Sequence, residues 1–364
     1  MHSSARRYPP QDEQVEEEAS EIENNTKRRK RFQSAFKVPT SNRPSHDHTA
    51  EDGFELYGSS GGRLTGINDD DDFIADDDSD DMDEEEEDTE DPEVLKQISG
   101  FQEEISQNPY NYSAHLNLVT LLRKTEHFDK LREARKSFSE FYPLTPALWI
   151  DWINDEQKIA SSEEEKKFVS SLFETGVADY VSVDLWLEYC QVCIGGVGSQ
   201  EGIKKARDVF EAAITSCGRN IAKGSHIWDA YRELESILLS MFPSEGSPEQ
   251  LEAHSDQRKK VDSLFKRQLR IPLQGMSSTF REYKEFLGGE VDNNAVSDYN
   301  KATQKLKARQ GFEDKLLSED NNEFYLEYLQ FELKEKDPVM IQQLYERAIT
   351  DNCLNETLWL DYLR

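Results

Sequence analysis

Apolar residues recur along most of the chain at the three- and four-residue spacing of amphipathic helices, in two phrases that alternate. The first phrase carries two aromatic residues three positions apart, so both lie on one face of a helix. It occurs six times, with the pairs Trp149/Trp152, Trp186/Tyr189, Trp228/Tyr231, Phe280/Tyr283, Tyr325/Tyr328 and Trp359/Tyr362. The pattern therefore predicts one kind of helix, repeated six times.

The second phrase is apolar around a single aromatic residue, often with an acid just after it. Its aromatics lie between copies of the first phrase and are Phe173, Phe210, Phe265, Tyr299 and Tyr345. Successive first-phrase aromatics, at positions 149, 186, 228, 280, 325 and 359, are 37, 42, 52, 45 and 34 residues apart. Periods of about 20 to 50 residues are typical of solenoids. We therefore predict an all-α fold, a right-handed α-solenoid of helix pairs.

Large aromatic residues suit such a fold for a physical reason. One helix pair cannot bury its own apolar face, so each pair must offer a large surface to the next. A tryptophan side chain buries roughly 200 Å². We interpret all the aromatics named above as repeat core that builds the fold, and not as ligand-binding residues.

The predicted organisation has two parts. A unit without tryptophan precedes the first Trp copy, and its ARKSF at 134–138 matches the ARDVF at 206–210. We expect a disordered tail over 1–91 and a solenoid over 92–364, with about six helix pairs and then the first helix of a seventh. Because an uncapped solenoid exposes its internal face, we expect a truncated array whose Trp359 helix is frayed or pairs with another copy.

The spacing also separates two repeat families. The tetratricopeptide pattern places Leu three and Gly four residues after its Trp. Here the third residue is aromatic, and the seventh is an acid in several copies, as at Glu156 and Glu235. This pattern resembles the half-a-TPR (HAT) repeat of RNA-processing proteins.

A narrower resemblance rests on PLTPALWIDWINDE, SVDLWLEYCQVCIGGVGSQEGIKKARDVFEAAI, HIWDAYRELE and LFKRQLRIPL. These phrases resemble the N-terminal HAT array of the squamous cell carcinoma antigen recognised by T cells 3 family. Its members are nuclear recycling factors that help U4 and U6 small nuclear RNAs reanneal after splicing. The resemblance implies a non-catalytic splicing scaffold in the nucleus, with snRNP or other RNA-processing proteins as partners. It also implies that RNA is held by RNA-recognition motifs that this chain does not show, so RNA contact here is indirect. Homodimer contacts in the family are attributed to later repeats.

Charge is concentrated in the tail. The acidic run at 69–93 holds 18 of the 74 acidic residues and no base; without it the net charge of −31 becomes −13. Such a run repels itself and cannot bury enough apolar surface to fold. We expect it to solvate the tail, to hold a basic partner such as a histone, or to accept phosphate at Ser79 or Thr89.

One basic cluster interrupts this acidic tail and consists of Lys27, Arg28, Arg29, Lys30 and Arg31. Basic runs of this length serve as nuclear localisation signals. We therefore predict nuclear import; the alternative is a solvated segment with no receptor.

Candidate chemistry is sparse. Cys190 and Cys193 form a CxxC inside a predicted helix, and no second pair follows at zinc spacing. The glycines of Gly195–Gly202 do not form a phosphate-binding GxGxxG, and the Asp-rich run lacks the glycine of a calcium loop. No stretch approaches 18 apolar residues. We expect no catalytic site, cofactor, metal or membrane contact.

Two alternatives remain. Another HAT protein, such as a pre-mRNA 3′-end cleavage or spliceosome-core factor, belongs to the same class. A solenoid that binds RNA directly would need a basic face, because phosphate contacts supply most of the affinity; the acidic balance disfavours it.

Overall fold

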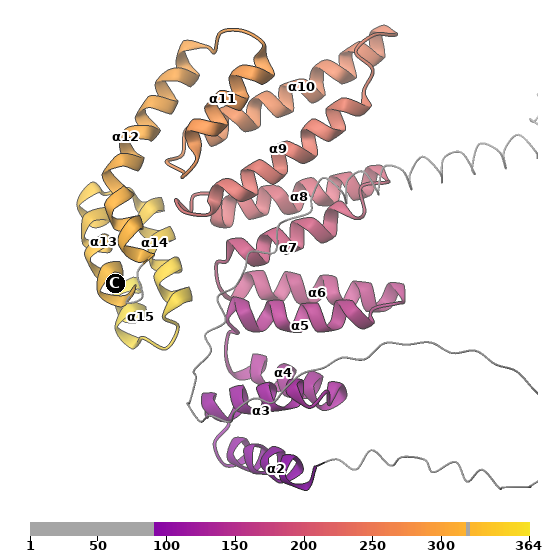
Figure 1. The fold of residues 1–364 in the computed structure, drawn as a ribbon, viewed down its shortest axis with the longest axis vertical. Coiled ribbons are helices and arrows are strands. Elements are labelled where there is room, and N and C mark those ends of the chain that lie inside the picture. The colour runs from indigo at the N-terminus through magenta and orange to yellow at the C-terminus, as the bar shows by residue number, and fades with distance from the viewer. Residues whose placement is uncertain (1–90, 318–320) are drawn as a thin grey trace, which may run out of the picture.

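The computed structural model describes residues 91–317 and 321–364, which form helices joined by short loops, with no strand among them (Figure 1). The first helix is α2 (Pro92–Gln107), which sequence reasoning did not separate from the first repeat. Six helix pairs follow, here called repeats 1 to 6, and then α15 (Glu356–Tyr362). The pairs are α3 (Tyr112–Lys124) with α4 (Phe128–Phe141), α5 (Pro146–Ile159) with α6 (Glu163–Asp179), α7 (Val183–Ile194) with α8 (Gln200–Cys217), α9 (Gly224–Met241) with α10 (Pro248–Gln268), α11 (Met276–Leu287) with α12 (Asn293–Leu316), and α13 (Asn321–Glu335) with α14 (Pro338–Asp351). The prediction of an α-solenoid is confirmed.

Local sequence sets where the helices begin and end. Proline stands in the first turn of α2, α5, α10 and α14, where its missing N–H costs nothing. Ser162 and Ser247 each form a capping box with the residue three positions on, which satisfies backbone donors at the start of α6 and α10. Gly275 and Gly288 flank α11 with φ of 80° and 66°, a backbone region that residues with a Cβ avoid.

The joints between repeats are built from stacked rings. The aromatic residue of a second helix stacks on the second aromatic of the next first helix, with ring centroids 4.9 to 5.2 Å apart. The stacked pairs are Phe173–Tyr189, Phe210–Tyr231, Phe265–Tyr283, Phe312–Tyr328 and Tyr345–Tyr362. Repeats 2 to 6 therefore each contribute an aromatic surface to the next first helix, as expected for a solenoid. In repeat 1, Phe138 stacks on His115 of its own repeat instead.

The array curves back on itself, and Figure 1 shows α13, α14 and α15 beside the loops at one end of α5 to α8. Gln343 on α14 donates a hydrogen bond to the Ser216 carbonyl at 2.7 Å, and Thr350 donates one to the Val181 carbonyl at 3.3 Å. Tyr180 and Ile221, from the loops before α7 and α9, are buried in the hydrophobic cluster of the last helices. The two halves of the array are therefore in direct contact.

This contact corrects the expectation for Trp359. Its helix was expected to fray or to pair with another copy, but α15 packs on the same chain. The Trp359 ring lies 6.3 Å from the Tyr180 ring, and its Nε1 donates a hydrogen bond to the Cys353 carbonyl at 2.9 Å. The sequence could not show this, because curvature depends on small rotations at every joint.

Within 91–317 and 321–364, no helix combines the length and the apolar character that crossing a bilayer requires.

Candidate functional site

The structure buries most of the residues assigned to the repeat core. Those that are less than a tenth exposed are Trp149, Trp152, Trp186, Tyr189, Trp228, Tyr231, Tyr283, Tyr325, Tyr328, Phe173, Phe210 and Phe265. Half-buried are Phe280, Tyr299, Tyr345, Trp359 and Tyr362. These side chains are therefore occupied by packing, and a functional surface has to be sought in the grooves between helices.

In repeat 5 the assigned aromatic does not form the joint. Tyr299 stacks on Phe280 of its own repeat at 4.2 Å, whereas Phe312 stacks on Tyr328 of repeat 6. The signal was present in the sequence, since ARQGF at 308–312 has the same form as ARKSF at 134–138 and ARDVF at 206–210. It was missed because α12 is long enough to hold two suitable aromatics.

The arginine of the motif shared by ARKSF, ARDVF and ARQGF forms an ion pair between repeats, which sequence reasoning missed. Arg207 binds Glu235 through two hydrogen bonds of 2.6 and 2.9 Å, and Arg309 binds Glu332 in the same way at 2.6 and 2.8 Å. At the first joint Arg135 binds Asp155 at 2.6 Å instead, while Arg132 holds the adjacent Glu156. The acid lies in each case in the second half of a first helix, and the arginine comes from the second helix before it.

The acid that follows the second-helix aromatic also crosses the joints. Glu174 accepts a hydrogen bond from the Tyr189 hydroxyl at 3.2 Å, and Glu346 accepts one from Tyr362 at 2.5 Å. Burial, reinforced by Glu346, raises the pKa of Tyr362 to about 12. The polar residues of the repeat thus fix the register between pairs, a structural role.

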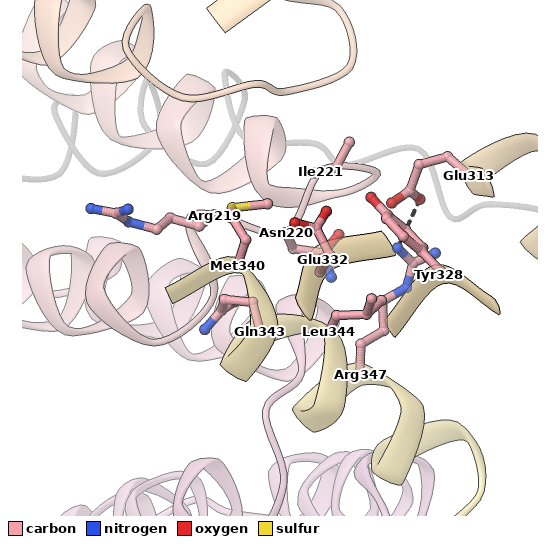
Figure 2. Close-up of a pocket in the computed structure, with 10 residues that line it drawn as sticks. All are labelled: Arg219, Asn220, Ile221, Glu313, Tyr328, Glu332, Met340, Gln343, Leu344 and Arg347. Atoms are coloured by element: carbon pink, nitrogen blue, oxygen red, sulfur yellow. Dashed lines mark hydrogen bonds and ion pairs between the residues drawn. The ribbon is translucent and has the colours of Figure 1, made fainter. Parts of the chain in front are cut away.

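The contact between the two halves of the array encloses a small pocket (Figure 2). Arg219, Asn220 and Ile221 line it from the loop before α9, and repeats 5 and 6 supply the opposite wall, where Arg347 binds Glu313 at 2.7 Å. Its volume is about 20 Å³, enough for roughly one water molecule. The pocket is therefore a joint between the halves and too small for a substrate.

Three larger clefts lie between neighbouring helices. The cleft between α6 and α8, floored by Trp186 and Tyr189 of α7, has a volume of about 540 Å³. The cleft between α4 and α6 measures about 290 Å³, and the one between α3 and α5, floored by α4, about 270 Å³. Each combines an apolar floor with charged edges, an arrangement that suits short peptide segments better than small polar substrates.

The described residues offer little reactive chemistry. Burial raises the pKa of the Cys193 thiol to about 11 and that of the Cys190 thiol well above its usual value, so neither is a ready nucleophile. In 91–317 and 321–364 no three His, Cys, Asp or Glu side chains are grouped as a metal site would require. The most deeply buried acids near the pocket of Figure 2, Glu313 and Glu332, are each held by an arginine.

Two sequence predictions lie outside the described residues. The basic cluster at Lys27–Arg31 falls there, and so does the acidic run up to residue 90. Both stay predictions.

Comparison with known proteins agrees with the repeated helix pairs that the structure shows. The family model described as PRP39 N-terminal HAT repeat matches residues 99–285, more than half of the chain. "Spliceosome associated factor 3, U4/U6 recycling protein" of Homo sapiens is 39% identical over 268 residues, which are 73% of this chain and 26% of that protein. The Danio rerio protein of the same name is 37% identical over 272 residues, 73% of this chain and 29% of its own length. At a greater distance, "mRNA 3'-end-processing protein rna14" of Schizosaccharomyces pombe is 22% identical over 191 residues, 52% of this chain and 24% of its own length.

The chain thus spans about a quarter of the length of the first two relatives. They are members of the family that the quoted phrases resemble, so that resemblance is confirmed. Together with the family model, they show that the chain belongs to the HAT-repeat family described as PRP39 N-terminal HAT repeat.

Proposed function

We propose that this chain is a non-catalytic HAT-repeat scaffold in RNA processing, acting in pre-mRNA splicing through assembly or recycling of the U4/U6 snRNP. Its mechanism is display: a rigid curved array holds protein partners in its open clefts. Nuclear import would depend on Lys27–Arg31, and the acidic run at 69–93 could add basic partners such as histones.

The proposal rests on the contrast between the side chains that hold the repeats together and the side chains that line the open clefts. The recurring aromatic residues, and the arginine–acid pairs at three of the joints, serve to hold neighbouring repeats together. The lining of the open clefts, in contrast, differs from one joint to the next. Clefts with apolar floors and individual charged edges favour protein segments as ligands. Relatives of this chain are named for U4/U6 recycling and for mRNA 3′-end processing, which supports a role in RNA processing.

Direct binding of RNA is a weaker proposal. Within the array, residues 256–315 carry an excess of bases, with 13 against 9 acids. Many of these bases are already paired: Lys266 with Asp262, Arg267 with Glu211 and Arg270 with Asp298. Paired bases release few counterions from a phosphate backbone, so they add little affinity for RNA.

The test is capture from nuclear extract on the immobilised full chain, with and without nuclease. We expect U4/U6 snRNP proteins to stay bound after nuclease. Ala212→Trp, which fills the cleft between α6 and α8, should reduce capture of a partner that uses this cleft. Ala147→Trp, at an exposed position outside the three clefts, is the matched control. Loss of all proteins after nuclease would refute a protein scaffold, and capture of 3′-end-processing factors alone would assign the chain to that process.

A further inference from the structure

The cleft between α3 and α5 has an unusual combination of features for this array. Val119, Phe138, Leu144 and Leu148 line its apolar floor, and its volume is about 270 Å³. A cavity of about 150 Å³ is enough to hold benzene. The cleft can therefore accept an aromatic side chain from another segment.

Positive charge exceeds negative charge along this lining. Arg123, Lys124 and Arg135 contribute three cations against Asp151. Both arginines are already paired: Asp155, behind the lining, binds Arg123 at 3.0 Å and Arg135 at 2.6 Å, and Asp151 binds Arg123 at 2.7 Å. Even with Asp155 counted, one cation is left over, and Lys124 is exposed at the edge of the cleft.

The other two clefts have the opposite balance. Glu174, Glu201 and Asp208 outnumber Lys204 and Lys205 between α6 and α8. Between α4 and α6, the lining holds three glutamates and one arginine. An acidic segment is therefore favoured at the cleft between α3 and α5 and disfavoured at these two.

The described chain begins one helix away from this cleft, on α2, which packs against α3. A loop of four residues, 108–111, joins α2 to α3, so the two helices run antiparallel. The start of α2 at Pro92 consequently lies at the same end of this hairpin as Lys124, as can be followed in Figure 1. Whatever precedes Pro92 therefore leaves the array at the end of the hairpin that carries Lys124.

The sequence before Pro92 contains a segment with matching chemistry. Within the acidic run, DDDDFIADDD at 69–78 places Phe73 and Ile74 between two groups of aspartates. Seventeen residues, 75–91, lie between Ile74 and Pro92, a length that spans up to about 60 Å when extended. The segment can therefore reach the cleft without any change in the array.

We propose that residues 69–78 bind in the cleft between α3 and α5 of the same chain, with Phe73 or Ile74 on the apolar floor and the flanking aspartates facing Lys124. The segment then acts as a built-in competitor, because an acidic peptide from a partner must displace it. Tethering raises its local concentration, so even weak binding fills the site. This inference concerns one cleft and does not depend on the splicing role.

The test places the photoreactive residue p-benzoylphenylalanine at position 73 of the full chain. After irradiation at low micromolar concentration, mass spectrometry should find cross-links to 119–124, 135–138 or 144–151. In a mixture of light and isotope-labelled chains, the cross-linked peptides should be all light or all labelled, which identifies binding within one chain. Mixed pairs would assign the cleft to a second copy and overturn the proposal.

Matched variants separate specific docking from general attraction. Lys124→Glu should lower the cross-link yield by roughly three- to tenfold. Lys136→Glu makes the same charge change on α4, one turn after Arg132 and so on the side of the other cleft, and should leave the yield unchanged. Ile74→Asp, which cannot disturb the folded array, should also lower the yield. Equal loss in both lysine variants, cross-links outside the cleft, or no cross-link at all would each refute the proposal.

Discussion

The three ion pairs formed by Arg132–Glu156, Arg207–Glu235 and Arg309–Glu332 provide a graded test of the joints. All three share one geometry, in which the guanidinium donates two hydrogen bonds to both carboxylate oxygens. They differ in the exposed fraction of the arginine side chain, which is 46%, 28% and 2% in that order. The acids are all buried, with 8%, 1% and 1% exposed.

The perturbation is a glutamate-to-glutamine change at each acid, which removes the charge and keeps the shape. Glu332→Gln leaves the buried guanidinium of Arg309 without its counter-charge, at a cost of about 3–5 kcal/mol. Glu156→Gln leaves Arg132 largely in contact with water, so the loss should be about 1 kcal/mol. Glu235→Gln should fall between them, because Arg207 is partly exposed and keeps a 3.1 Å hydrogen bond to Gln257.

The assay is urea unfolding followed by circular dichroism, together with hydrogen exchange of the helices that each pair joins. Exchange is needed because a repeat array can open locally, so one global transition need not report every joint. Asp256→Asn, in a pair whose partners are 74% and 59% exposed, is the control and should change stability by less than about 0.5 kcal/mol. Equal losses at the three joints, or the reverse order, would refute the argument that burial of the arginine sets the cost.

Three other predictions concern the core, a cap and the contact between the halves. Trp186→Ala should cost about 3–5 kcal/mol and Trp359→Ala clearly less in urea unfolding, because Trp359 is only half-buried on Tyr180. Hydrogen bonds from Ser161 and Ser162 lower the pKa of Glu165 from 4.5 to about 2. A lowered carboxyl pKa stabilises the fold above pH 4.5, and this contribution is lost as the pH falls toward 2; in thermal melts Glu165→Gln should therefore reduce the stability difference between pH 5 and pH 2. The double change Tyr180→Ala and Gln343→Ala should increase the radius of gyration in small-angle X-ray scattering, and no increase would show that the curvature does not need this contact.

The repeat joints were largely accessible to sequence reasoning. Aromatic rings at a fixed spacing, such as Trp186 and Tyr189, form an apolar face that has to be buried. In a repeat array that face is buried against the neighbouring repeat. The ion pairs could have been found as well, because the Arg three residues before Phe210 or Phe312 recurs together with an acid seven residues after a first-helix aromatic. The residue that forms the joint after repeat 5, Phe312, was not singled out, because spacing alone does not choose between Tyr299 and Phe312 on one long helix.

The clefts and the contact of Tyr180 with Trp359 were not accessible. A sequence pattern gives the period of a solenoid, but its curvature accumulates from small rotations at each joint. Residues 180 and 359 come together only because of that curvature. The charge of a cleft is likewise a sum over helices that are neighbours in space, as with Lys124 and Asp151.

The central claim is that the array binds proteins, and that it meets RNA through them. The most direct test is fluorescence anisotropy of labelled U6 RNA with the purified full chain, starting at about 50 mM salt, where phosphate contacts are strongest. A variant with neutral residues at Lys27–Arg31 separates any contribution of the basic cluster from that of the array. The account predicts no saturable binding by that variant. Saturable binding that weakens steeply with added salt would contradict it and identify the array as an RNA-binding surface.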